Sequence, residues 1–118
     1  MKIPKPSAVD RQRFLALVPA DERVDTKPMF GNLGAFINGN MFMGLFGADV
    51  GVKLSAPDQE RLRAAGGGPF GPTERPMSGY VTLPPTVEAE QSAEWIARAV
   101  DHVSALPPKK SRSRSRQS

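Results

Sequence analysis

The chain has 118 residues, 39% of them hydrophobic and 24% charged, a balance typical of one globular domain. It contains no cysteine, which excludes disulfides, thiol catalysis and thiolate metal sites. The net charge of +4 comes from one end: residues 109–118 hold five of the sixteen basic residues and no acid, which leaves eleven basic against twelve acidic residues in 1–108. These values exclude a strongly basic folded domain.

The N-terminal region predicts a loose leader over residues 1–6 and then a short helix. Ser7 followed by Asp10 is a capping pattern, an apolar stripe begins at Phe14, and Pro19 ends the helix. No apolar run is long enough to cross a bilayer and no signal-peptide core is present, so we expect a cytoplasmic protein with no membrane partner.

Three strands are expected next, over residues 30–37, 41–46 and 50–54. The first two are joined by Asn38-Gly39, the strongest short signal for a hairpin. The third alternates apolar residues with Gly51 and Lys53, which indicates a half-buried strand.

Side-chain alternation assigns the two faces of this hairpin. One face is expected to carry Leu33, Ala35, Ile37, Met41, Met43 and Leu45. The other is expected to carry Phe36, Phe42 and Phe46. Helices on both faces would bury both sets, whereas a sheet covered on one face only would leave the second set for a partner.

In the second half of the chain the sequence predicts a short helix that begins at Ser55 and ends near Gly66, followed by a glycine-proline loop. A strand at 80–83 and a helix over 91–106 are expected after this loop. The fold class is therefore α+β, an antiparallel meander sheet with flanking helices in the order α-β-β-β-α-β-α. The domain spans 7–106, and a disordered basic Ser/Arg tail is expected over 107–118.

Short motifs occur in a fixed order from about residue 10 to residue 105. They are Met29-Phe30-Gly31, Asn38-Gly39-Asn40-Met41-Phe42, Gly66-Gly67, Pro69-Phe70, Pro76-Met77, Gly79-Tyr80 and Trp95. In these the chain resembles the TfoX N-terminal domain family, the first half of the TfoX/Sxy competence regulators, also found as free-standing bacterial proteins. The resemblance implies a compact α+β fold and a regulatory role, with no catalytic residue, cofactor or substrate to carry over. Pro28 and Asn32 depart from the family pattern, which commonly has a lysine and a second glycine there.

Candidate chemistry is sparse. His102 is the only histidine, and without cysteine a zinc site would need carboxylates for its other ligands, so no metal site is expected. The glycines at 66–71 follow a helix instead of preceding one, which disfavours a phosphate-binding loop. An enzymatic or small-ligand alternative places Arg75 and His102 beside a pocket near these glycines. Because no nucleophile or paired acid and base accompanies them, we expect no enzyme, no catalytic residue and no cofactor.

The sharpest functional prediction is a docking surface on the sheet. Methionine and aromatic side chains adapt readily to the shape of a partner, and Met29, Met41, Met43 and Met77 supply such side chains. We expect Phe36, Phe42, Met43 and Phe46 to bind an unidentified protein partner or a second copy of the chain. The chain is then a regulatory adaptor that acts by protein contact and is linked to transcription.

The tail offers an alternative function. Its basic residues are Lys109, Lys110, Arg112, Arg114 and Arg116. Such an arm neutralises about four or five phosphates, which predicts weak, salt-sensitive binding of nucleic acid without sequence preference. A plain solubilising end is the competing interpretation.

Overall fold

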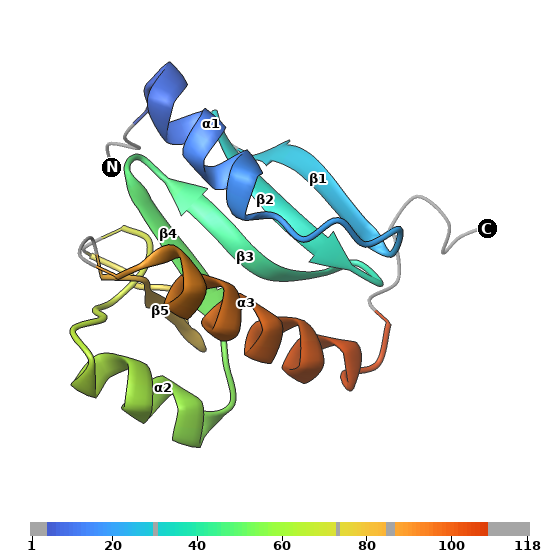
Figure 1. Ribbon diagram of the computed structural model, residues 1–118, viewed down its shortest axis with the longest axis vertical. Helices are drawn as coiled ribbons and strands as arrows, with labels where there is room; N and C mark the ends of the chain where they lie inside the picture. Colours follow the sequence, from blue (N-terminus) through green and yellow to red (C-terminus); the bar gives the residue numbers. More distant parts are fainter. Residues whose placement is uncertain (1–4, 30, 73, 85–86, 109–118) are drawn as a thin grey trace.

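The computed structural model describes residues 5–29, 31–72, 74–84 and 87–108. Four strands follow the first helix, and the fifth lies between the last two helices (Figure 1). The elements are α1 (Ala8–Leu17), β1 (Val24–Met29), β2 (Asn32–Ile37), β3 (Asn40–Phe46), β4 (Asp49–Lys53), α2 (Ala56–Ala64), β5 (Tyr80–Thr82) and α3 (Ala89–Ser104). The predicted tail residues 109–118 and most of the predicted leader lie outside the described ranges.

The strands form one antiparallel sheet in the order β1-β2-β3-β4-β5, which confirms the predicted α+β meander. The hairpin at Asn38-Gly39 is the local reason for this order. Both residues have positive φ, 54° and 81°, as a two-residue type I′ turn requires. Ile37 therefore lies opposite Asn40, and β2 folds directly back onto β3.

Strand β1 is an addition to the predicted order. Its sequence, Val-Asp-Thr-Lys-Pro-Met, has no apolar alternation, and most of its residues are exposed. Pro28 has no backbone N–H to donate to a neighbouring strand, and proline within a sheet is for this reason found on edge strands. Strand β1 is an edge strand of the sheet. This segment is a strand because it pairs with β2, from Val24 opposite Ile37 to Met29 opposite Asn32.

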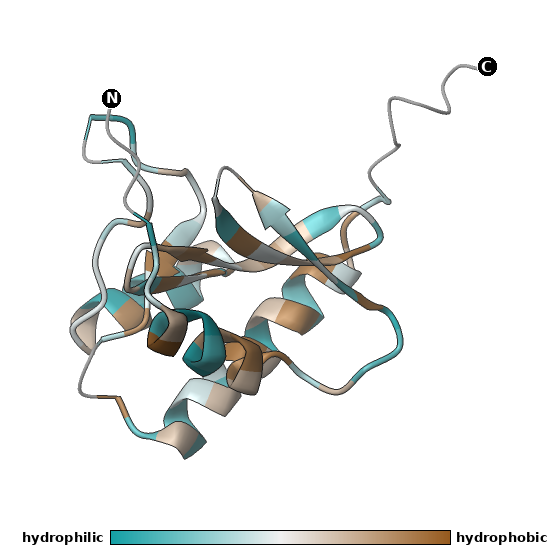
Figure 2. Ribbon diagram, turned by 90° about the horizontal axis from the view of Figure 1, so that it is seen from above, coloured by the Kyte–Doolittle hydropathy of each residue, from teal (hydrophilic) through white to brown (hydrophobic). Residues whose placement is uncertain are grey.

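Helices α1 and α3 cover one face of the sheet, which we call the core face (Figure 1). Seen from above, both helices lie on one side of the strands, and hydrophobic residues gather in the strands and in α3 (Figure 2). The capping box predicted at Ser7 and Asp10 is present: the Asp10 N–H donates to Ser7 Oγ and the Ser7 N–H donates to Asp10 Oδ2. Phe14 is the fully buried residue by which α1 joins the core.

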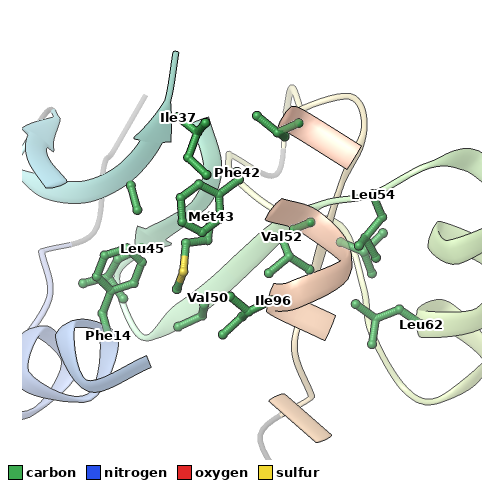
Figure 3. Packing of buried hydrophobic residues seen from close by; sticks show 14 residues of the cluster. Phe14, Ile37, Phe42, Met43, Leu45, Val50, Val52, Leu54, Leu62 and Ile96 are labelled. Carbon is green, nitrogen blue, oxygen red and sulfur yellow. The ribbon is translucent and has the colours of Figure 1, made fainter. Parts of the chain in front are cut away.

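The core lies between these helices and the sheet (Figure 3). It consists of Phe14, Ala35, Ile37, Phe42, Met43, Leu45, Val50, Val52, Leu54, Leu62, Val81, Ile96, Ala99 and Val103. From α3 the contributors are Ile96, Ala99 and Val103, which recur at helical spacing along one face of the helix. Trp95 is half-buried and packs against the same cluster, with the Arg98 guanidinium 5.6 Å from its ring centroid.

Helix α2 lies beside β5 and makes few contacts with the rest of the domain. Leu62 is its one buried residue, and Asp58 Oδ1 accepts a 3.1 Å hydrogen bond from Arg98 of α3. The predicted cap Ser55 makes no side-chain capping bond. The C-terminal end is a Schellman motif, because Gly66 has a φ of +114° and the Gly67 N–H donates to the Leu62 carbonyl. Within the described ranges, no helix is both long enough and apolar enough to cross a membrane.

Candidate functional site

A β-bulge in β3 decides which side chains face the core. Ala35 lies opposite Met43, but Phe36 lies opposite Met41, so Phe42 is an extra residue on its strand. Phe42 and Met43 are both 0% exposed and both lie in the core (Figure 3).

The expectation that Phe42 shares a face with Phe36 and Phe46 is therefore wrong, because the bulge resets the alternation of side chains along β3. Neither Phe42 nor Met43 offers a surface to a partner. The same shift separates Met41 from Met43 and Leu45, with which it was expected to share a face, and places it on the face opposite the core, which we call the outer face.

The outer face is hollow where three glycines line up across neighbouring strands. Gly34 of β2 lies opposite Gly44 of β3, and Gly44 lies opposite Gly51 of β4. This glycine row has no side chains of its own, so other side chains lie directly on the backbone. A Cβ built on Gly51 would lie 2.4 Å from Cγ of Phe70. One built on Gly44 would lie 3.1 Å from Met41 Cε and 3.2 Å from Phe70 Cζ.

An apolar groove of about 350 Å³ lies over this hollow. We call it the outer-face groove, and its lining residues are Met29, Asn32, Leu33, Met41, Gly44, Leu45, Phe46, Phe70, Pro72 and Met77. Three of the four methionines singled out from the sequence thus line one groove, while Met43 lies on the core face. A groove of this size lined by thioethers and aromatic rings suits an apolar side chain of a ligand or a partner.

Phe70 closes one end of the groove. Its ring is 2% exposed and lies between Phe46 and Tyr80, with centroid separations of 6.2 Å and 5.8 Å. The loop that carries it is tied down because the Met77 N–H donates to the Phe70 carbonyl at 2.8 Å. An aromatic ring of the chain itself therefore fills the space above Gly51.

Two polar side chains fix the backbone under the groove. The Tyr80 hydroxyl donates a 2.8 Å hydrogen bond to the Met41 carbonyl, and burial raises the pKa of Tyr80 to about 12. Asn32, one of the departures from the family pattern, is 3% exposed and its Oδ1 accepts from the Gly47 N–H at 2.8 Å. The other departure, Pro28, is accommodated at the sheet edge.

Two cations lie at the β1–β2 hairpin, and neither of them lines the groove. Lys27 lies opposite Gly34 in the register, and its Nζ is 5.2 Å from the ring centroid of Phe36. Arg11 reaches the turn between β1 and β2, where its Nη2 donates to the Gly31 carbonyl at 3.2 Å. In the part of the chain that the structure describes, neither cation forms a salt bridge.

The predicted site residues thus divide into three groups. Phe36 and Phe46 are half-buried on the outer face, and Phe46 lines the groove. Phe42 and Met43 are in the core. The tail residues Lys109, Lys110, Arg112, Arg114 and Arg116 lie outside the described residues.

The fold does not bring together the two residues of the enzymatic alternative. Arg75 is exposed in the loop that follows Phe70, on the side of the outer face, whereas His102 lies on α3, which packs on the core face. Neither residue lines the outer-face groove. Within the described ranges, no three His, Asp or Glu side chains are grouped so that they could hold a metal ion.

A second hollow of about 400 Å³ lies between α2 and α3 beside Trp95. Its two cations are already engaged, because Arg61 and Arg98 both donate to Asp58 Oδ1 and Arg98 also donates to Glu94. These contacts raise the pKa of Arg98, with the hydrogen bond to Glu94 as the largest cause. We interpret this cluster as the tie that holds α2 against α3.

Phe70 and the glycine row were not found from the sequence. Phe70 stands in a glycine-proline segment that indicates a loop, and each glycine by itself indicates only a weak point in a strand. A usable signal does exist, because Gly34, Gly44 and Gly51 fall on three consecutive predicted strands. Only the register shows that they are adjacent.

Comparison with known proteins agrees with the fold. The family model described as the TfoX N-terminal domain matches residues 16–103, which is most of the chain, so the chain belongs to this family. At the coarse level, membership supports a regulatory module related to competence proteins. Searches of curated proteins and of solved structures gave no match.

Proposed function

Starting from its membership of the TfoX N-terminal domain family, we propose that this chain is a non-enzymatic regulatory adaptor that binds a protein partner through the outer-face groove. One observation carries the proposal: helices α1 and α3 pack on the core face, while a methionine-lined groove of about 350 Å³ lies on the other face of the sheet. Apolar surface left in this way on a small domain is typical of an interaction site. A link to transcription is part of the proposal and rests on the family alone.

The test uses matched charge insertions on one loop. Met77→Glu places a carboxylate in the groove, whereas Ser78→Glu places the same group on the exposed neighbouring residue. Affinity capture on nuclease-treated lysate is run with the wild type and both variants. A partner retained by the wild type and by Ser78→Glu, but lost with Met77→Glu, supports the proposal. Equal retention by all three proteins refutes it.

The same proteins separate the alternative partners. If the groove binds a second copy, light scattering shows a dimer for the wild type and Ser78→Glu and a monomer for Met77→Glu. If the basic tail provides the only binding, capture depends on nucleic acid and is unaffected by either substitution. A thermal melt of each variant shows whether the fold is intact before binding is compared.

A further inference from the structure

One buried polar side chain on the core face has no hydrogen-bond partner. Among the described residues, Asn32 and Ser92 are the buried polar ones, and the Asn32 Oδ1 accepts from the Gly47 N–H. Ser92 of α3 is 4% exposed, and its hydroxyl forms no hydrogen bond within the described ranges. Buried hydroxyl groups are nearly always paired, because an unpaired one has lost its hydrogen bonds to water. An unpaired Ser92 therefore points to a ligand, provided that a pocket reaches it.

Such a pocket lies between α1, the β3–β4 turn and the start of α3, and Ser92 lines it. Its volume is about 380 Å³, and we call it the α1–α3 pocket. The walls are mainly apolar, with Leu17, Val50 and Leu83 at the edge of the core. Pockets that bind small molecules have volumes of about 300–1,000 Å³, apolar walls and a few polar groups.

Two charged side chains line the same pocket without being paired. Arg13 of α1 and Asp49 at the start of β4 form no salt bridge and no side-chain hydrogen bond in the described part of the chain. Asp10, one turn before Arg13, is held by Ser7 instead: the hydrogen bonds with Ser7 are the main cause that lowers the pKa of Asp10, and the charge of Arg13 is the smallest. The pocket thus presents one positive and one negative group to a ligand.

The start of α3 adds hydrogen-bond donors. Glu88, the N-cap residue, makes no side-chain capping bond, so the N–H groups of residues 89–91 have no acceptor among the described residues. Ala89 lines the pocket together with Ser92, whereas the exposed acids Glu88 and Glu90 do not. Unpaired N–H groups at a helix start and a guanidinium group are both donors that suit a carboxylate.

We propose that the α1–α3 pocket binds a free α-amino acid with an aliphatic side chain. The carboxylate of the ligand lies toward Arg13 and the start of α3, and the Ser92 hydroxyl donates to it. The ammonium group lies toward Asp49, and the aliphatic side chain packs on the apolar walls. A zwitterion of this kind pairs both charges of the pocket and gives Ser92 the partner that the fold does not supply. The inference goes beyond the proposed function, because the outer-face groove is on the other face of the sheet.

Titration of ¹⁵N-labelled protein with L-leucine, followed by NMR, tests the site directly. We expect saturable shifts of the amide signals of residues 48–50 and 87–92, and no shift at Met77 in the outer-face groove. Three matched compounds each lack one feature of leucine: 4-methylpentanoate lacks the ammonium group, 3-methylbutylamine lacks the carboxylate, and glycine lacks the side chain. Each of them is expected to bind roughly tenfold more weakly than leucine, or weaker still.

Three substitutions assign the roles of the polar residues. Arg13→Gln and Asp49→Asn each weaken leucine binding by about tenfold, whereas Arg11→Gln, a matched change on the same helix outside the pocket, leaves it unchanged. Ser92→Ala weakens binding by about two- to tenfold. The melting temperature of ligand-free Ser92→Ala does not fall, because alanine removes a buried hydroxyl that has no partner in the fold.

Each contrary outcome overturns a stated part of the inference. If leucine at tens of millimolar causes no saturable shift at residues 48–50 and 87–92, the site is refuted. Equal affinity for 4-methylpentanoate refutes the role of Asp49, and equal affinity for 3-methylbutylamine refutes that of Arg13 and the helix start. If Ser92→Ala melts at a lower temperature and binds leucine as the wild type does, the hydroxyl is structural and its role here is refuted. Capture of a partner that depends on Met77 is independent of these results, so the proposed function would still stand.

Discussion

Replacing Gly51 by alanine tests whether Phe70 lies on the glycine row. The new Cβ would lie 2.4 Å from two atoms of the Phe70 ring, against an ordinary contact of 3.4–4 Å, so the ring must retreat by about 1 Å. Overpacking of this kind costs about 1–3 kcal/mol. Alanine is better than glycine inside a strand by about 0.5–1 kcal/mol. We therefore expect a net loss of stability of about 0–2.5 kcal/mol.

A double-mutant cycle isolates the clash. In a Phe70→Ala background the space above Gly51 is empty, so Gly51→Ala becomes stabilising by about 0.5–1 kcal/mol. Urea unfolding of the four proteins then gives a coupling energy of about 1–3 kcal/mol, which equals the clash. Gly44→Ala, with its nearest contacts at 3.1 Å and 3.2 Å, is the milder control. If Gly51→Ala still lowers the stability after Phe70 is removed, or raises it while Phe70 is present, this placement of the ring is refuted.

Four other results are expected. The pKa of Tyr80 is raised from 10.0 to about 12, so the fold favours the neutral phenol: stability is complete below about pH 10 and falls by about 3 kcal/mol as the pH rises to 12. Tyr80 is the only tyrosine, so phenolate absorbance reports it directly, and a midpoint near 10 in the folded state contradicts the burial. In urea unfolding, Phe42→Ala costs about 3–5 kcal/mol, whereas Phe36→Ala, at a half-buried site, costs less; equal costs contradict the assignment of faces. Ser7→Ala removes a capping box and lowers stability by about 1 kcal/mol, measured by thermal melts, and no change speaks against a contribution from the cap. If residues 109–118 bind nucleic acid, filter binding has a log–log salt slope of about −4 that disappears when they are deleted; unchanged retention at low salt rules out this arm.

Local sequence was sufficient wherever the deciding interactions are short in range. Asn38 and Gly39 tolerate positive φ, so the β2–β3 hairpin was predictable from two residues. The capping box of Ser7 and Asp10 spans one helical turn, and the stripe of α3 follows from its period alone. The α+β class followed from these elements and their order.

Segments that depend on a distant partner were not predictable in the same way. Residues 24–29 have neither alternation nor strong strand propensity, and they become β1 only because β2 offers a ladder. Phe42 was assigned to the wrong face because alternation assumes an unbroken register, and the bulge at Phe42 is a property of β2 and β3 together.

The groove shows the same division most clearly. By itself, the sequence determined that glycines occur on three consecutive predicted strands, and it was sufficient to assign the chain to its family. Only the tertiary structure decided that Gly34, Gly44 and Gly51 form one row, that Phe70 covers one end of it, and that methionine side chains cover the other. The reason is physical: a strand's own residues set which side chains alternate, but the register between strands decides which of them meet.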